Sequence, residues 1–357
     1  MNVRVESSRI IKPSYQGFPP PTTIHIPLSV FDKVTFVTHV ALIYAYRSPN
    51  PPNITLELGL QKALSVYREW AGRFGEDNNG GPVILLNDEG MRFVETSVDS
   101  TLDQAMPLKP SESLLSLLPS LKGVVELVQV QFTRFTCGSL VLGFTTHHRV
   151  ADGHFISNFL FLAKLKARTY LMNGANKPYN TFESHVAHLW RAITKARALS
   201  GFETTHIRIA VNGCTRLNPR VLDEYFGNLV LWIFPCAKVM NLLGEPLPYA
   251  TKLIHDAVAK VNNNYFKSFI DFASYKVEEE DLITTTDADA PVLCPNLEVN
   301  CLIRLPFYDL DFGEGRPYIS MPSYTPIEGF LFLQQIWDNL ITLEQICYSI
   351  ELFGPKI

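Results

Sequence analysis

The sequence has few charged residues and no excess of positive charge. Asp, Glu, Lys and Arg make up 18% of its 357 residues, and the formal net charge at pH 7 is −4. Like charges do not gather into runs along the chain. Proteins that bind nucleic acid neutralise phosphates with many basic side chains, so this composition argues against a nucleic-acid partner. A local cluster of Lys and Arg that binds a small anion is still compatible with it.

Long hydrophobic runs are also missing. The apolar window FISNFLFLAKLKA (155–167) is too short for a transmembrane helix and contains two lysines near its end. The first stretch of the chain, MNVRVESSRIIKPSYQG (1–17), contains no apolar segment of signal length, and its alternating pattern indicates a strand. We therefore expect no membrane segment and a cytoplasmic location.

The cysteines form no disulfide or metal-binding pattern. They occur at irregular spacing, without a C-x-x-C pair, at Cys137, Cys214, Cys236, Cys294, Cys301 and Cys347. In a cytoplasmic chain this pattern is typical of buried, reduced thiols. His185 and His188 are three residues apart in a predicted helix, but no third histidine or carboxylate accompanies them at suitable spacing. We therefore expect no metal site.

The length and the apolar content favour two domains. With 357 residues, of which 46% are hydrophobic, the chain is long enough for more than one large core. Helical and strand patterns mix without a regular βαβ rhythm, which predicts an α/β fold built from mixed α+β sheets. The loop MNGANKPYN (172–180) interrupts the pattern and marks a boundary. We expect an N-terminal domain over 1–171 and a C-terminal domain over 181–357.

Several helices and strands can be predicted from local periodicity. Apolar residues recur every three or four positions over residues 54–74, which predicts a helix capped by Asn53. Further helices are predicted at 181–199 and near 247–265, and a strand is predicted at 206–213. These elements alternate in a way that fits the mixed architecture.

The segment TTHHRVADG (145–153) lies where a strand is predicted to end. Residues 128–135 alternate between apolar and polar side chains, and a turn at 137–139 returns the chain in a second strand. That strand ends at two adjacent histidines, and an apolar helical run follows Asp152 and Gly153. Loops at strand ends project side chains into clefts, so the histidines are candidate site residues.

The two histidines have different predicted roles. Side chains alternate across a strand, so at most one of them faces a cleft, and we interpret His147 as structural. A single loop histidine is commonly a hydrogen-bonded structural residue, which is one interpretation of His148. The other is a general base, because a neutral imidazole accepts protons near neutral pH and contributes roughly 10² to 10⁴ in rate. No nucleophile motif such as G-x-S-x-G accompanies it, so such a base would deprotonate a substrate.

Two separated motifs resemble those of a known family. The segment His148-Arg-Val-Ala-Asp152-Gly153 resembles the H-x-x-x-D-G signature of the plant BAHD acyltransferases. Downstream, Asp311-Phe312-Gly313-Glu314-Gly315 resembles their second signature, D-F-G-W-G, with Glu314 in place of tryptophan. The blocks PLSVFDKV, TFESHVAHLWR and EYFGNLV are also similar, so the resemblance covers nearly the whole chain.

The resemblance implies a two-domain fold similar to chloramphenicol acetyltransferase, with a channel between the domains. Acyl-CoA would enter as co-substrate from one face and the acceptor from the other, with no permanently bound cofactor. His148 would take the proton of the acceptor as it attacks the thioester, and the CoA thiolate would leave without a covalent enzyme intermediate. The carboxylate of Asp152 would point away from the channel and pair with an arginine, for which Arg216 is the candidate. The block Asp311–Gly315 would shape the fold, where glycines permit tight turns.

Within the family, the blocks FTTHHRVADG and PFYDLDFGEGRP are similar to grass enzymes that move hydroxycinnamoyl groups to amines such as agmatine. We therefore expect a monomer that binds acyl-CoA and a small amine. A cationic acceptor favours a carboxylate in the channel, and Glu328 is either that group or a solvated turn acid. Two alternatives stay open. One is a shortened member with little or no activity that only binds CoA or a partner, and the other is an O-acyltransferase acting on an alcohol or phenol.

Two of the departures from the family pattern are shortened stretches. The stretch KARTYLMNGANKP (166–178) directly joins helices that other members separate by several dozen residues. After EGFLFL (328–333) the chain omits a strand-turn-strand that members carry before their last helix. A lost strand leaves backbone groups unpaired, and each costs on the order of 1 to 3 kcal/mol when buried. We therefore expect a weakened scaffold around residues that still carry the chemistry.

Overall fold

A computed structural model provides the fold of most of the chain. It describes residues 2–15, 17–106, 108, 112–153, 156, 181–221, 225–274, 294–302, 305, 307–312, 314–323, 328–336 and 340–342. The predicted domain boundary at 172–180 lies outside these residues. The helical run expected after Gly153 also lies outside them, apart from Ile156.

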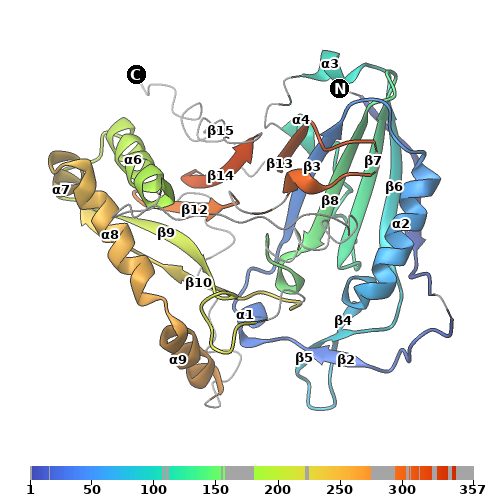
Figure 1. The fold of residues 1–357 in the computed structure, drawn as a ribbon, viewed down its shortest axis with the longest axis horizontal. Coiled ribbons are helices and arrows are strands. Elements are labelled where there is room, and N and C mark those ends of the chain that lie inside the picture. The colour runs from blue at the N-terminus through green and yellow to red at the C-terminus, as the bar shows by residue number, and fades with distance from the viewer. Residues whose placement is uncertain are drawn as a thin grey trace.

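A six-stranded mixed sheet forms one half of the molecule (Figure 1). Its strands, in order across the sheet, are β1 (Val3–Ile11), β6 (Met91–Val98), β7 (Val128–Phe135), β8 (Leu140–His147), β3 (His39–Tyr46) and β13 (Ile319–Pro322). The pair β6 and β7 is parallel, and the other neighbours are antiparallel. The predicted hairpin of β7 and β8 is therefore confirmed, and it forms the middle of this sheet. Its turn contains Gly138 with a φ of +79°, a conformation that favours glycine.

This first sheet is covered on both faces. The apolar side chains of β7 pack in a core with α2 (Asn53–Val66). The other face packs against α3 (Leu102–Ala105) and α4 (Glu112–Leu115). On that side, the amide of Gln131 donates a hydrogen bond to the carbonyl of Ser116 at 2.8 Å. The polar half of the strand pattern is therefore buried as well. Gln131 and Thr133 find partners there, whereas the side-chain amide of Gln129 has none among the described residues.

A second mixed sheet forms the other half (Figure 1). In order, its strands are β10 (Val230–Ile233), β9 (Thr204–Asn212), β12 (Leu297–Cys301), β14 (Phe330–Ile336) and β15 (Leu340–Thr342), and β11 (Cys236–Lys238) also pairs with β9. The central strand β12 is parallel to both of its neighbours. The strand predicted at 206–213 is confirmed as part of β9, and both sheets have the mixed character expected from the sequence.

The helices that the structure describes in this half cover one face of the second sheet, and its other face is turned toward the first sheet (Figure 1). These helices are α6 (Thr181–Ala196), α7 (Val239–Gly244), α8 (Leu247–Lys260) and α9 (Asn263–Ser274). Their buried side chains share a core with every second residue of the strands, such as Ile207 and Ile209 of β9. The helix predicted near 247–265 is divided at Val261, which is fully buried between α8 and α9.

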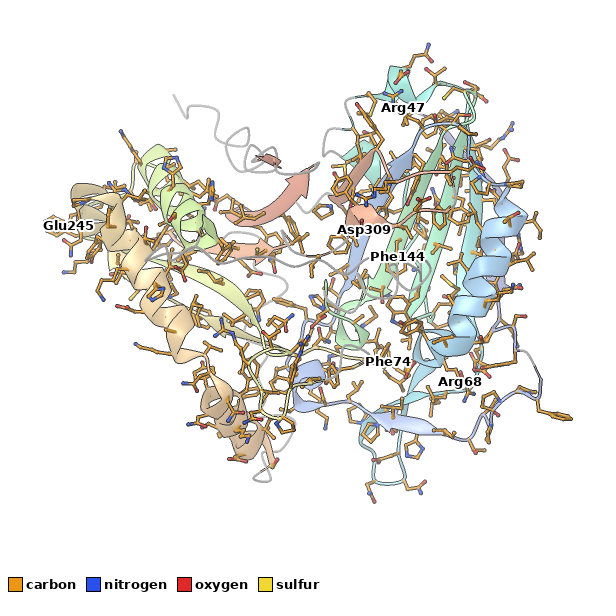
Figure 2. The ribbon with its side chains drawn as sticks, in the orientation of Figure 1. Arg47, Arg68, Phe74, Phe144, Glu245 and Asp309 are labelled. Carbon is orange, nitrogen blue, oxygen red and sulfur yellow. The ribbon has the colours of Figure 1, made fainter. Side chains whose placement is uncertain are left out.

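The helix predicted over residues 54–74 is wrong in its second half. After α2 ends, a 3₁₀ turn, η1 (Arg68–Ala71), leads directly into β4 (Arg73–Glu76). The strand β4 belongs to a small sheet with β2 (His25–Pro27) and β5 (Pro82–Leu85). Arg68, labelled in Figure 2, is buried, and its guanidinium binds the carboxylate of Asp88 at 3.0 Å. A continued helix would have left this side chain on the solvent face, so the buried ion pair favours the tighter turn.

Asn53 does not cap α2 as predicted. Pro52 occupies the cap position, and no side chain there accepts a hydrogen bond from the helix. The amide of Asn53 instead donates to Glu95 at 3.0 Å, and its oxygen accepts from Arg134 at 2.9 Å. These bonds fasten the start of α2 to the first sheet, so the side chain stabilises packing rather than the helix end.

The C-terminal half returns to the first sheet. The turn η4 (Phe307–Asp309) places Phe307 in the same core as α2, and β13 pairs with β3. The region predicted as a domain over 181–357 therefore contributes a strand to the sheet of 1–171. Further on, β14 continues into an antiparallel pairing with β15. Within the described residues, β15 therefore pairs with the end of β14. This is the place where the sequence predicted that a strand is missing.

The cysteines are less buried than the sequence suggests. Cys214 is buried, Cys301 is half-buried, and Cys137, Cys236 and Cys294 are exposed, all as free thiols. Within the described part of the chain, no three His, Cys, Asp or Glu side chains are grouped in a way that would hold a metal ion. The helices of these same residues are too short or too polar to cross a membrane.

Candidate active site

His148 begins the short 3₁₀ turn η2 (His148–Val150) that follows the last residue of β8. Its backbone N–H donates to the carbonyl of Thr38 at 2.8 Å, just before β3. Its backbone carbonyl accepts from the side-chain amide of Asn228 at 2.9 Å, just before β10. The loop is therefore held from both halves of the molecule, and this fixes the direction in which the imidazole leaves the backbone.

The imidazole of His148 lies in an apolar setting. The residue is half-buried, and the ring centroid is 6.2 Å from that of Phe36. The Nδ1 atom is buried and makes no hydrogen bond with the residues that the structure describes. Burial lowers the pKa of this imidazole, although the nearby carboxylate of Asp152 opposes the effect. The ring is therefore neutral at pH 7, which is the state that accepts a proton.

His147 has the contacts of a structural residue. Its Nδ1 accepts a hydrogen bond from the N–H of Arg149 at 3.2 Å. Its ring meets His39 and Phe74 edge to face, with centroids 5.0 and 4.8 Å away. Phe74 lies below Phe144 of β8 in the view of Figure 2. Burial lowers the pKa of His147 to about 4. These contacts support the structural role predicted for it.

Asp32 anchors the loop of His148 through Asn228. It lies in α1 (Val30–Lys33), where it forms a capping box with Ser29. Its carboxylate accepts from the backbone N–H of Asn228 at 2.7 Å and from the side-chain amide at 2.9 Å. Both residues are buried, and burial raises the pKa of Asp32 while the hydrogen bonds oppose the shift. Sequence reasoning missed this pair, although each residue lies in a block that resembles the family.

The predicted pairing of Arg216 with Asp152 is wrong. The guanidinium of Arg216 donates to the carbonyls of Val258 and Val261 at 3.2 and 2.5 Å, at the end of α8. Carbonyls at a helix C-terminus lack partners within the helix and attract cations, which explains this placement. Asp152 is buried, and its carboxylate accepts from the backbone N–H of Leu229 at 3.3 Å.

The next residue of the motif, Gly153, is in close contact with the C-terminal half. An added Cβ at Gly153 would lie 3.2 Å from Leu305, so the motif packs tightly at this point. Together, Asp152 and Gly153 attach the loop to the residue before β10 and to the chain before η4.

The second motif packs against β3. The N–H of Gly315 donates to the carboxylate of Asp311 at 2.9 Å and closes the turn, and Gly315 has a φ of +123°. The ring of Phe312 lies 5.3 Å from that of Tyr46, whose hydroxyl donates to the carbonyl of Leu310 at 3.1 Å. These contacts fit the structural role that the resemblance implies. Gly313 lies outside the described residues.

Glu328 fits neither of its two predicted roles. It is only 8% exposed, so it is not a solvated turn acid. Its carboxylate pairs with the guanidinium of Arg197, which also donates to the carbonyl of Asn296 at 3.0 Å. The negative charge of Glu328, which would attract a cationic amine, is therefore already neutralised by Arg197. Arg197 could not be predicted as its partner, because the two residues are 131 positions apart in the sequence.

A cavity of about 510 Å³ lies beside α1 and the chain before β10, the two segments that hold the loop of His148. It is lined by α1 with the two residues before it, by the end of α9, and by Leu217, Val221, Tyr225 and Leu229. Ser29 and Leu229 line it, and each of them also bonds a carboxylate of the network described above. His148 does not line this cavity, so the channel implied by the family resemblance is still a prediction.

Comparison with known proteins agrees with this arrangement. A family model described as Transferase family matches residues 1–172 and 161–335. The chain belongs to this family, that of the BAHD acyltransferases. It is 42% identical to agmatine coumaroyltransferase-1 of Hordeum vulgare over 93% of each chain. It is also 41% identical to agmatine hydroxycinnamoyltransferase 1 of Oryza sativa subsp. japonica, over 93% of this chain and 92% of that relative.

Solved structures share the fold. Vinorine synthase matches with a TM-score of 0.70 at 20% identity, over 94% of this chain and 92% of the other. TRI101 of F. sporotrichioides, complexed with coenzyme A and T-2, matches with a TM-score of 0.71 at 14% identity, over 87% and 92%. The two-domain BAHD fold predicted from the sequence is thereby confirmed.

The comparisons also contain the gaps noted in the sequence. The alignment with the barley relative runs over 409 positions, which is more than the 357 residues of the chain. The family model matches in two pieces that overlap at 161–172 and ends at residue 335. The overlap includes the start of the stretch 166–178, and the match ends two residues after the block 328–333.

Proposed function

We propose that this chain transfers a hydroxycinnamoyl group from coenzyme A to a small amine such as agmatine, with His148 as general base. Relatives at 38 to 42% identity are named agmatine coumaroyltransferase, agmatine hydroxycinnamoyltransferase and putrescine hydroxycinnamoyltransferase. Acyl-CoA is the co-substrate of this reaction. We place the reaction in the cytoplasm and assign it to a monomer.

In the proposed reaction, His148 moves one proton. The amine nitrogen forms a bond to the thioester carbonyl carbon, and the imidazole accepts the proton that this nitrogen loses. The tetrahedral intermediate then breaks its C–S bond, and the imidazole returns the proton to the thiolate. The products are an amide and free CoA thiol, without a covalent enzyme intermediate.

One observation carries the proposal. His148 lies at a strand end, where its backbone N–H donates to the carbonyl of Thr38 and its backbone carbonyl accepts from the amide of Asn228. A base with this fixed orientation needs little reorganisation when the substrate arrives. Asp152 supports the same loop through Leu229 rather than through the imidazole. The geometry therefore favours a base that acts on the substrate directly.

A second candidate is a shortened BAHD member that binds CoA but turns over slowly. The divided family match and the gapped alignment favour it, because both are consistent with missing segments. A thermal melt separates the two candidates. Stabilisation by CoA without thiol release supports the binding role, and thiol release with an amine supports catalysis.

The acceptor class can be tested with coumaroyl-CoA and a panel of acceptors. The panel contains agmatine, putrescine, tryptamine and shikimate, and the readouts are free thiol and product mass. We expect amide products from agmatine and putrescine. Ester formation from shikimate alone would instead support the O-acyltransferase, since a tobacco shikimate O-hydroxycinnamoyltransferase is 27% identical to the chain. Thiol release without any acceptor would indicate hydrolysis.

A further inference from the structure

The second sheet carries a buried ion pair on the face that its helices leave free. Arg208 of β9 and Glu298 of β12 are register partners, and a guanidinium nitrogen lies 3.2 Å from a carboxylate oxygen. The flanking residues Ile207, Ile209 and Val299 belong to the helix-covered core. Because side chains alternate across a strand, Arg208 and Glu298 project from the opposite face. That face is turned toward the first sheet (Figure 1).

The guanidinium of Arg208 lies among three aromatic rings. Its central carbon is 3.9 Å from the ring centroid of Trp232 and 5.9 Å from that of Phe234, and both residues follow Asn228 in the chain. The third ring is that of Phe36, at 5.3 Å. Phe36 comes from the segment between α1 and β3, so Arg208 joins rings from the two halves of the molecule. A planar cation suits such a place because it attracts the faces of the rings.

Phe36 is also the ring beside the candidate base. Its centroid is 6.2 Å from that of His148, and Thr38, two residues on, accepts the hydrogen bond of the His148 backbone. The start of this segment is held by Arg149, whose guanidinium donates to the carbonyl of Lys33 at 3.1 Å. The ring of Phe36 is therefore a neighbour of both Arg208 and the imidazole of His148.

Stability alone does not explain the ion pair. Arg208 is 6% exposed and Glu298 is 3% exposed, and burial lowers the pKa of the guanidinium and raises that of the carboxylate. Apolar side chains of similar volume would fill this space without the loss of hydration. The carboxylate is also held in one orientation, because the amide of Asn300 donates to its other oxygen at 3.2 Å. A buried charge that is held in one orientation despite its loss of hydration is typical of a group that positions a neighbouring side chain.

We propose that Arg208, held by Glu298, is a positioning residue that keeps Phe36 packed against the imidazole of His148. This rests on the proposed role of His148 as base. Through Phe36, the second sheet excludes water from one side of the imidazole and limits its rotation. The other titratable or charged groups at the ring are Asp152 and His147, and Arg149 and His39 lie beside His147.

The variant Arg208→Lys tests this role because it keeps the charge beside Glu298 but removes the planar group between the rings. We expect kcat to fall about tenfold while KM for coumaroyl-CoA stays within about twofold, as for a base that is slightly misplaced. We also expect the acidic limb of the pH profile to move to higher pH, because water would reach the imidazole. Phe36→Leu should give the same changes, and the double variant should be no slower than the slower single variant. Phe36→Tyr keeps a ring and should retain most of the activity.

The control is Arg191→Lys. Arg191 of α6 is half-buried, and its guanidinium donates to the carbonyl of Leu243 at 3.2 Å. It should alter neither kcat nor the pH profile.

Titration of the His148 imidazole by NMR supplies a readout that needs no turnover. One outcome is that the pKa of His148 rises in Arg208→Lys while the wild-type protein shows no transferase activity. That pair of results would support the positioning role and overturn the proposed function. An unchanged imidazole pKa and an unchanged kcat, or additive effects in the double variant, would overturn the positioning role. If Arg208→Lys does not fold, the same readouts on Phe36→Leu decide.

Discussion

The side-chain amide of Asn228 donates to the backbone carbonyl of His148 at 2.9 Å and to the carboxylate of Asp32 at 2.9 Å. Asn228 is 80 residues from His148 and 196 from Asp32 along the chain. One amide thus ties the loop of the candidate base to α1 and to the second sheet. The position of the imidazole therefore depends on contacts that form only in the folded chain.

Asn228→Ala is expected to lower both the free energy of unfolding and kcat. The carboxylate of Asp32 would keep only one of its two bonds to residue 228, and a buried group left without a partner costs on the order of 1 to 3 kcal/mol. Urea unfolding measures the loss, and kcat should fall with it because the loop of His148 is released. Asn264→Ala, at an exposed position of α9, is the control. Wild-type stability and kcat in Asn228→Ala would contradict the anchoring role.

Glu328→Gln is expected to lower stability without weakening amine binding. Arg197 would keep its charge in a buried place without a counter-charge, which costs about 3 kcal/mol or more. Urea unfolding and KM for agmatine are the two measurements. A stable variant with a strongly raised KM would restore Glu328 as the group that meets the amine.

Asp152→Asn and Arg216→Met are expected to act independently. Arg216 binds carbonyls at the end of α8, and Asp152 accepts from Leu229, so the two changes remove different contacts. Their effects on the free energy of unfolding should add to within about 0.5 kcal/mol. Denaturant unfolding of both single variants and of the double variant gives the coupling. A coupling well above this value would support the ion pair that the sequence suggested.

His147 makes stability depend on pH. Its pKa falls to about 4 in the folded protein, below the value of about 6.5 in an unfolded chain. Between these values only the unfolded chain binds the proton, so stability falls as the pH falls from 7 toward 4. From pH 7 to pH 5 the expected loss through this group is about 2 kcal/mol. His147→Asn keeps an acceptor for Arg149 and should flatten the dependence, and an unchanged slope would speak against the buried neutral ring.

His148 gives activity a pH dependence of its own. Burial lowers the pKa of its imidazole, so the base stays neutral to a lower pH than an exposed histidine. The acidic limb of kcat/KM should therefore lie below about pH 6.5. A limb at or above that pH would indicate an imidazole that is open to water, or another group as base.

Local patterns in the sequence predicted much of the architecture. The alternation in VQVQFTRF and the turn at Gly138 specify a hairpin by themselves, and so they place His148 at a strand end. Contacts between distant residues carry no local pattern. For this reason Arg216 was assigned the wrong partner, the pairing of Glu328 with Arg197 was missed, and Asp32, Asn228 and Arg208 had no predicted role. Helix 54–74 failed for a similar reason, because the burial of Arg68 beside Asp88 overrides its periodicity.

The most direct test of the account compares wild type with His148→Ala in thiol release from coumaroyl-CoA with agmatine. We predict a loss of roughly 10² to 10⁴ in kcat, because the variant has no base in reach of the amine. The melting temperature should stay within a few degrees, because the loop is held by backbone bonds of residue 148 that alanine keeps. A variant that retains its turnover would contradict the role of His148 and with it the proposed mechanism.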